Sequence, residues 1–325
     1  MITRRWIVGT ASGLVAAIAG AGSAPVLAEV PDGGAFVAVV AVVPETVANA
    51  ANVPTKSSGI HAIDATVAGT NVVVPVDAVD GISLSSETST VSIGLPFATQ
   101  ANNARVEQTG VVSYNNNNGS TTVPVLTADG NIQINTVIES ASAPTRYEYP
   151  IDIPAGGTVV QSKEDDSVVV FDASGEVIMT VAAPWAKDAR GNSVPTRYEV
   201  VNDVLTQVVD HSHSFIYPII ADPYVGNGVF YSSAWISNTA RGYIVNAVPT
   251  AEGRRLNAVN VLGTHLRQLK KILGSQSSKV TPTIREQFYC HVVGNFLEPG
   301  TYNMESWRPY KDWGWQLNPW DRCNP

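Results

Sequence analysis

The sequence predicts a mainly β protein: an N-terminal antiparallel β-sandwich or meander domain, followed by a small α+β domain that carries one disulfide. Short runs rich in β-branched residues recur along residues 59–225, and turn residues separate them at the spacing of an antiparallel sheet. Both cysteines and five of the seven tryptophans follow residue 225, which sets the C-terminal part apart. A composition of 44% hydrophobic and 15% charged residues excludes a disordered chain.

Residues 1–28 have the pattern of a secretory signal peptide. Arg4 and Arg5 supply its positive start, an uncharged apolar stretch follows, and Val26-Leu27-Ala28 supplies a small-residue cleavage site. The paired arginines also fit a twin-arginine signal, so the export route stays open. We therefore expect a secreted protein, extracellular or in the cell wall, that meets a membrane only if the signal stays uncleaved.

Residues 29–58 form an Ala/Val-rich lead-in, in which the apolar run Phe36–Val43 predicts a short strand or a linker. Residues 59–225 form the acidic β-rich domain, with hairpin turns expected at Asn115–Gly119, Asp129-Gly130 and Asp172–Gly175. Its predicted strands are Asn71–Val76, Thr90–Ile93, Gly110–Tyr114, Ile132–Ile138, Ser167–Phe171, Val177–Val181, Tyr198–Val204 and Phe215–Ile220.

Charge divides the chain at the same place as composition. Residues 29–225 hold 22 Asp and Glu against 7 Lys and Arg, a net charge of −15, whereas residues 226–325 hold 6 against 11, a net charge of +5. An acidic surface repels phosphate, so we expect no specific nucleic-acid binding by the acidic domain. We place the basic, Trp-rich α+β domain at residues 226–325.

In this second domain, Val229–Ile236 and Tyr243–Val248 predict two strands, and Pro249-Thr250 begins a helix that Gly274 ends. Leucines at three- and four-residue spacing define one face of that helix. The opposite face is either solvated or a docking site for polyanions. Its basic residues are Arg254, Arg255, Arg267, Lys270 and Lys271.

An even cysteine count in an exported chain predicts one disulfide, between Cys290 and Cys323. A catalytic Cys290 beside His291 is the alternative. The loop that this disulfide would close is dense in aromatic rings, which form either a sugar-stacking platform or the core of a small lobe. The rings considered for a ligand platform are Trp307, Trp313 and Trp315.

The candidate acid–base residues are His291, Glu305 and Arg308, with His291 as base and Arg308 steadying an anion. No hydrolase, zincin or phosphate-binding motif is present, and we expect neither a cofactor nor a metal. One hypothesis is a non-enzymatic protein that binds a cell-wall glycan or another envelope component. The other is a secreted effector-like enzyme that hydrolyses nucleic acid or wall polymer through residues 228–325. Whether the chain is an enzyme stays open.

The C-terminal motifs resemble a family. Gln287–His291, Tyr302–Pro309 and Arg322–Pro325 resemble the end of a domain of unknown function found in secreted actinobacterial proteins, in which Cys-His, Asn-x-Glu, Arg-Pro and a closing Cys-Asn-Pro recur. Gly94–Phe97 and Tyr217–Pro223 are similar to leader regions of other exported actinobacterial proteins. The resemblance implies a β-rich presentation region ahead of a domain that carries any specific activity, and it implies no reaction.

Overall fold

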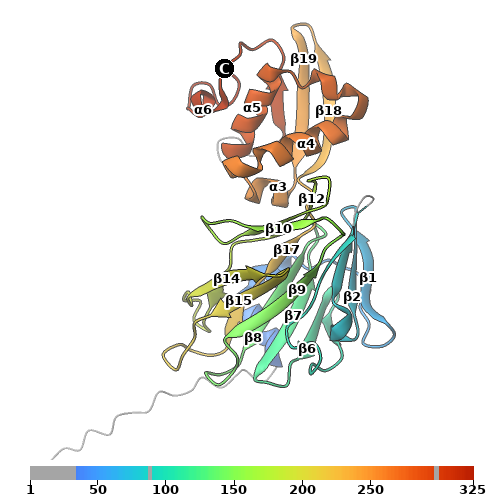
Figure 1. The fold of residues 1–325 in the computed structure, drawn as a ribbon, viewed down its shortest axis with the longest axis vertical. Coiled ribbons are helices and arrows are strands. Elements are labelled where there is room, and N and C mark those ends of the chain that lie inside the picture. The colour runs from blue at the N-terminus through green and yellow to red at the C-terminus, as the bar shows by residue number, and fades with distance from the viewer. Residues whose placement is uncertain (1–33, 87–89, 296–299) are drawn as a thin grey trace, which may run out of the picture.

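The computed structural model describes residues 34–86, 90–295 and 300–325. The expected signal peptide lies outside these residues. The fold is mainly β, as predicted, with 38% strand and 20% helix. Figure 1 shows a large β part at one end of the long axis and a smaller part of mixed helix and strand at the other. We call residues 61–226 the β sandwich and residues 231–325 the C-terminal module.

Two antiparallel sheets make up the β sandwich. The first has seven strands in the order β1-β2-β3-β4-β9-β15-β14. Their bounds are β1 His61–Val67, β2 Thr70–Pro75, β3 Ile82–Ser85, β4 Thr90–Ile93, β9 Arg146–Asp152, β15 Val204–Val209 and β14 Thr196–Val201. A 3-10 turn, Ala78–Asp80, connects β2 to β3.

The second sheet has ten strands, eight of them in the order β10-β11-β12-β17-β8-β7-β6-β5. The other two, β16 and β13, extend from β8. Their bounds are β10 Thr158–Gln161, β11 Val168–Phe171, β12 Val177–Val181, β17 Tyr224–Gly226, β8 Ile132–Ile138, β7 Ser120–Leu126, β6 Val111–Asn115, β5 Arg105–Gln108, β16 Ile219–Ala221 and β13 Ala186–Lys187.

The main core lies between the two sheets, because alternate side chains of each strand point toward the facing sheet. On β9, Tyr147 and Tyr149 are fully buried while their neighbours are exposed. From the second sheet, Ile132 and Ile134 of β8 enter the same core. This is the sandwich arrangement that the short alternating runs predicted.

The prediction for Phe36–Val43 was wrong, because this run forms a helix rather than a strand or a linker. Helix α1 spans Gly34–Val42, and α2, Pro44–Ala48, follows it. A short apolar run has no period that separates a buried helix from a buried strand. Val39 packs with Val123 and Val137 on the outer face of the ten-stranded sheet. With α1 outside and the first sheet inside, β7 and β8 are buried at every position.

The three expected hairpin turns are confirmed, and Gly119, Gly130 and Gly175 each have a positive φ. Most predicted strands are also confirmed to within one residue. The run Tyr198–Val204 is not one strand, because the chain reverses between β14 and β15 at Asn202 and Asp203, both with positive φ. Of the run predicted at 215–220, only the last two residues are in a strand, since β16 begins at residue 219.

The C-terminal module contains a three-stranded antiparallel sheet with helices on one side. The single predicted helix is broken, because 3-10 and extended residues separate α3 from α4. Its predicted ends are confirmed: Thr250 caps α3, and Gly274 ends α4 with a positive φ. The elements are β18 Tyr231–Thr239, β19 Gly242–Pro249, α3 Ala251–Arg255, η2 Val259–Val261, α4 Leu262–Leu273, η3 Gly274–Lys279, α5 Pro282–Val293, β20 Tyr302–Glu305 and α6 Trp313–Gln316.

The two parts meet where α3 lies against β12 and β17. The Glu252 side chain is 1% exposed, accepts a hydrogen bond from the Thr180 hydroxyl, and pairs with Arg255 at 2.6 Å. Gly226 has no room for a side chain, because an added Cβ would lie 2.5 Å from the Glu252 carboxyl carbon. Arg267 lies 3.5 Å from Glu176 of the β sandwich. The basic residues of the predicted helix therefore do not form one solvated face.

Candidate functional site

The sheet of the C-terminal module has one covered face and one open face. Helices α4 and α5 pack on the covered face, where Val245, Ala247 and Met304 are buried. Side chains alternate between faces along a strand, so the residues between these point the other way. On that other face Trp235, Asn246 and Asn303 occupy one row across β18, β19 and β20.

Hydrogen bonds connect the side chains of the open face. The Trp235 indole donates to the Ser237 hydroxyl at 3.1 Å, and the Asn246 amide donates to the same oxygen at 3.0 Å. The Asn303 side-chain amide donates to the side-chain oxygen of Asn246, Oδ1, at 2.8 Å. We call Trp235, Ser237, Asn246 and Asn303 the open-face strip. These bonds fix the polar groups in place while Trp235 stays 44% exposed.

Glu305 lies at the end of this face, two residues beyond Asn303 on β20. The Gln287 side chain of α5 holds its backbone with two hydrogen bonds, accepting from the Glu305 N–H at 2.7 Å and donating to its carbonyl at 3.0 Å. The Glu305 carboxylate accepts from Arg308 at 2.5 Å. Two of the three candidate acid–base residues therefore form an ion pair beside the strip.

His291 lies on the other side of the sheet. Its ring is 1% exposed and stacks on Tyr302 with centroids 5.4 Å apart and planes 13° from parallel. Burial lowers the pKa of His291 to about 4, so the imidazole is neutral. Tyr302 points to the covered face and Glu305 to the open face, so the three candidates do not meet in one cleft.

The predicted disulfide between Cys290 and Cys323 is present, with Cα atoms 5.3 Å apart, so neither sulfur is a free thiol. It closes the C-terminal loop onto α5. Trp313 is partly buried there, and its backbone N–H donates to the Glu286 carboxylate of α5 at 3.2 Å. Trp315 is 75% exposed.

The three tryptophans of the predicted ligand platform therefore lie in three different environments. Trp313 packs among the residues of the module's core, whereas Trp315 extends into solvent. Trp307 is partly buried near the β18–β19 turn, where an added Cβ on Gly242 would lie 3.6 Å from its ring. Sequence reasoning missed Trp235, Ser237 and Asn246 as site residues; alternation within β18 and β19 is the signal that places them on one face.

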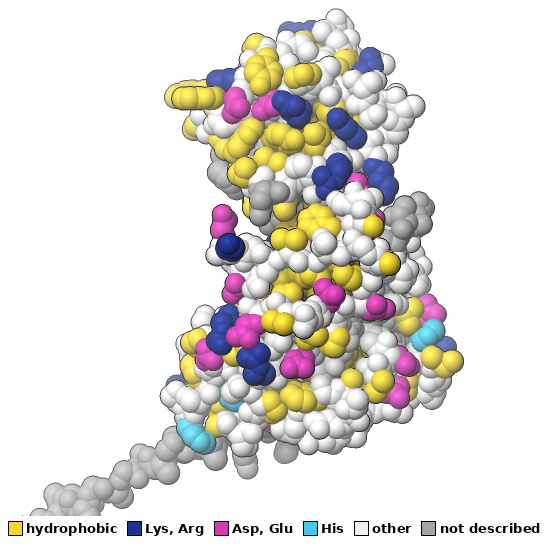
Figure 2. Space-filling view, viewed as in Figure 1, with side chains coloured by type: hydrophobic (Ala, Val, Ile, Leu, Met, Phe, Trp, Pro, Cys, Tyr) yellow, Lys and Arg dark blue, Asp and Glu magenta, His cyan; other side chains and the backbone are white. Residues whose placement is uncertain are grey.

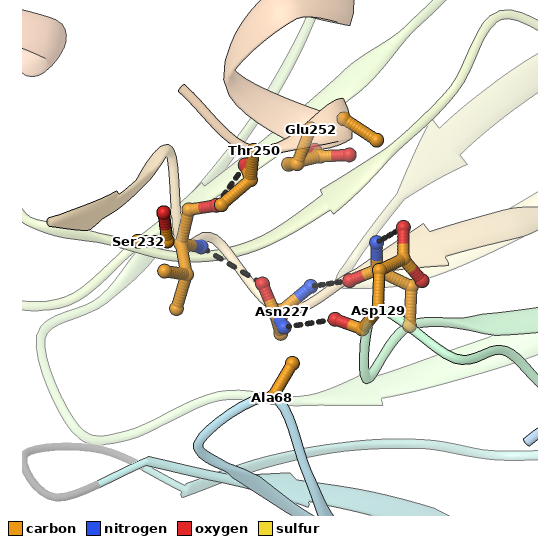
Figure 3. Close-up of a pocket in the computed structure, with 9 residues that line it drawn as sticks. Ala68, Asp129, Asn227, Ser232, Thr250 and Glu252 are labelled. Carbon is orange, nitrogen blue, oxygen red and sulfur yellow. Dashed lines mark hydrogen bonds between the residues drawn. The ribbon is translucent and has the colours of Figure 1, made fainter. Parts of the chain in front are cut away.

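Figure 2 shows Lys and Arg side chains over the C-terminal module and Asp and Glu mostly over the β sandwich, which agrees with the charge counts. A cavity of about 200 Å³ lies at the junction. Figure 3 shows Asn227 within it, and the Asn227 amide donates to Thr70 at 2.9 Å while its oxygen accepts from the Val229 N–H at 2.9 Å. These polar groups bind the β sandwich to the connecting segment, which is a structural role.

Within the described ranges, no group of three or more His, Cys, Asp or Glu side chains is arranged to hold a metal ion. The helices of the same ranges include none that is long and apolar enough to cross a membrane.

Together the fold and the site define a mainly β protein that ends in a disulfide-closed α+β module with one open sheet face. Residues 231–325, less than half of the chain, match a family model described as a protein of unknown function, DUF2599. This match confirms that the C-terminal region is a domain of unknown function; the leader resemblance stays a prediction. Neither the curated proteins nor the solved structures that were compared include a match to this chain.

Proposed function

We propose that this protein is exported and non-enzymatic, and that its open-face strip binds a glycan of the cell wall. The observation that carries the proposal is the exposed Trp235 ring in one row with Asn303, a partly exposed amide that the buried Asn246 side chain holds in place. A flat aromatic ring provides an apolar surface for a sugar ring, and a few positioned amides provide hydrogen bonds that orient it.

The charge of this face supports a neutral ligand. The strip consists of an indole, a hydroxyl and two amides, and the neighbouring Glu305 and Arg308 neutralise each other. Nucleic-acid binding depends on unpaired Lys and Arg that neutralise phosphates. A polysaccharide rich in hydroxyl groups therefore fits this surface better than a polyanion does.

The placement of the candidate acid–base residues favours binding over hydrolysis. A general base must reach the proton that it removes, and His291 is buried on the covered face. Cys290 is oxidised in the disulfide, so it provides no thiolate. The disulfide itself supports export, because such bonds persist in oxidising compartments outside the cytosol.

Binding to insoluble cell-wall glycan tests the proposal. We expect Trp235→Ala and Asn303→Ala each to weaken the binding of the full oxidised chain about tenfold or more, which corresponds to about 1.4 kcal/mol. Trp315→Ala is the matched control, because it removes an exposed indole elsewhere on the module, and its binding should be unchanged. Equal affinity of the Trp235→Ala variant and the wild type would refute this site, and release of soluble sugar would favour the hydrolase.

A further inference from the structure

Strand β18 forms an open edge of the C-terminal sheet. It spans nine residues, Tyr231–Thr239, and pairs only with β19. Apart from its ladder with β19, the backbone of β18 makes one hydrogen bond within the part of the chain that the structure describes. In that bond the Asn246 side chain donates to the Trp235 backbone carbonyl at 3.3 Å. The side chains of β18 include no charged residue and no proline.

The other edge strands of the described sheets are protected in the usual ways. Short length, charged side chains, proline and β-bulges are devices by which proteins prevent edge strands from pairing with another chain. Strands β10 and β20 have four residues each, and β13 has two. The longer or more exposed edges carry charges, which are Asp64 on β1, Arg105 and Glu107 on β5, and Arg197 and Glu199 on β14. Among these edges β18 alone is long, uncharged and free of proline; its one protection is a β-bulge at Ser232, which leaves Ser233–Thr239 in regular pairing with β19.

We propose that β18 pairs antiparallel with β18 of a second copy of this chain, about a two-fold axis through Trp235. In this register the residue numbers of paired positions add to twice 235, and like meets like from Ser232 to Asn238, whereas the terminal pair, Tyr231 with Thr239, is unlike. The two polar pairs are Ser232 with Asn238 and Ser233 with Ser237, and the apolar pairs are Ala234 with Ile236 and Trp235 with itself. Cross-strand pairs of this kind stabilise antiparallel sheets.

Shifting the register of the β18–β18 pairing by two residues would place unlike side chains opposite each other. It would place Trp235 opposite a serine and Ala234 opposite Asn238, or Ile236 opposite Ser232. A shift of one residue would move every side chain to the wrong face. The sequence of β18 therefore selects one register for self-pairing.

The shape of the molecule permits this pairing. Strands β18 and β19 run roughly along the long axis of the molecule, and the β sandwich lies beyond one end of them (Figure 1). An antiparallel partner therefore carries its β sandwich at the opposite end. The two sheets join into one of six strands, with the two open-face strips side by side. Self-association does not depend on whether that face binds a glycan.

Sedimentation of the full chain without any ligand tests the pairing. We expect wild-type protein to change from monomer to dimer as its concentration rises from about 1 µM to about 100 µM. A double variant with Ser232→Lys and Asn238→Lys places like charges opposite each other at both ends of the paired strands, and it should stay monomeric.

The matched control is the double variant with Ser232→Glu and Asn238→Lys, which places opposite charges at the same positions and should dimerise again. Both variants change the same exposed residues, so a loss of folding would affect them alike, and circular dichroism verifies their folding. A monomeric wild type over the whole range overturns the proposal. Equal behaviour of the two double variants overturns it as well, because the register then differs from the one inferred.

Discussion

The β sandwich and the C-terminal module differ in how many faces of a sheet are covered by other elements. In the sandwich, α1 covers the outside of β7 and β8 while the first sheet covers the inside, so every residue of these strands is buried. In the C-terminal module the helices cover one face, and the other presents Trp235 to solvent. Covering apolar surface stabilises a fold, so a sheet face that is ordered but left uncovered is a candidate for binding a ligand.

The two parts also bury titratable groups of opposite kinds. Asp222 lies fully buried beside the core of the sandwich, where burial raises its pKa to about 7. His265 and His291 are buried in the C-terminal module, where burial lowers the pKa of each to about 4. Burial disfavours the charged form in every case, so a fall in pH changes the contribution of these groups to stability in opposite directions: Asp222 becomes neutral in acid, and the two histidines become charged.

The largest effect should come from the disulfide, which only the C-terminal module has. Its cysteines are separated by 33 residues, and closing such a loop contributes about 3 to 4 kcal/mol in the chain-entropy model. We expect Cys290→Ser to lower the unfolding transition of the C-terminal module and to leave that of the sandwich in place. Calorimetry with and without reductant measures both transitions, and wild type in reductant should match the variant. Equal lowering of both transitions would show that the two parts unfold as one.

The second largest effect should come from the titration of Asp222, which makes the stability of the β sandwich depend on pH. Its carboxylate oxygen accepts hydrogen bonds from the Trp185 N–H at 3.0 Å and from Gln207 at 2.8 Å, and Tyr149 and Tyr198 are its ionisable neighbours. A pKa raised on folding gives stability that is complete below the unfolded pKa of about 4 and is lost as pH rises through 7. The sandwich should therefore lose on the order of 3 kcal/mol between pH 4 and pH 8.

Asp222→Asn isolates this contribution, because the amide keeps the accepting oxygen and cannot ionise. We expect the variant to be more stable than wild type at pH 8, with little dependence on pH, as measured by denaturant unfolding. A variant that keeps the wild-type slope between pH 4 and pH 8 would place the titrating group elsewhere.

The titration of His291 should change the stability of the C-terminal module by a smaller amount and in the opposite direction with pH. A pKa lowered on folding gives stability that is present above the unfolded value of 6.5 and is lost as pH falls through about 4. His291→Phe keeps a flat ring against Tyr302 and removes the titration. We expect the C-terminal module of wild type to lose on the order of 2 kcal/mol more than the variant between pH 6.5 and pH 4. His265, whose pKa burial also lowers to about 4, adds to the acid sensitivity that the variant keeps, and His265→Phe serves as the comparison.

Features that depend on neighbouring residues could be predicted from the sequence. The hairpin at Asp172–Gly175 is one, because the Asp172 carboxylate accepts from the N–H groups of Ser174 and Glu176 within the turn itself. The disulfide could be predicted for a different reason, since a chain with two cysteines has a single possible intramolecular pairing and the expectation of export favoured an oxidised state.

The open-face strip could not be predicted in the same way. Trp235 lies 11 residues from Asn246, and Asn246 lies 57 residues from Asn303, so only the register of three strands brings them into one row. His291, Glu305 and Arg308 are close in sequence, yet the alternation of β20 separates His291 from the other two. Sequence proximity therefore suggested a site that the sheet divides.

The smallest expected effect concerns the ion pair between the two parts. Arg267 lies 3.5 Å from Glu176 and donates to the Gly175 carbonyl at 2.6 Å, but its side chain is 44% exposed. Exposed pairs contribute about 1 kcal/mol or less because water and salt screen them. Arg267→Ala should therefore lower the stability of the junction by less than about 1 kcal/mol, and the difference from wild type should vanish in 1 M salt.

The comparison is Arg255→Ala, which leaves the buried Glu252 carboxylate unpaired. This variant should lose more stability than Arg267→Ala, in low and high salt alike. If Arg267→Ala costs as much as Arg255→Ala, surface charge rather than the buried contact holds the two parts together.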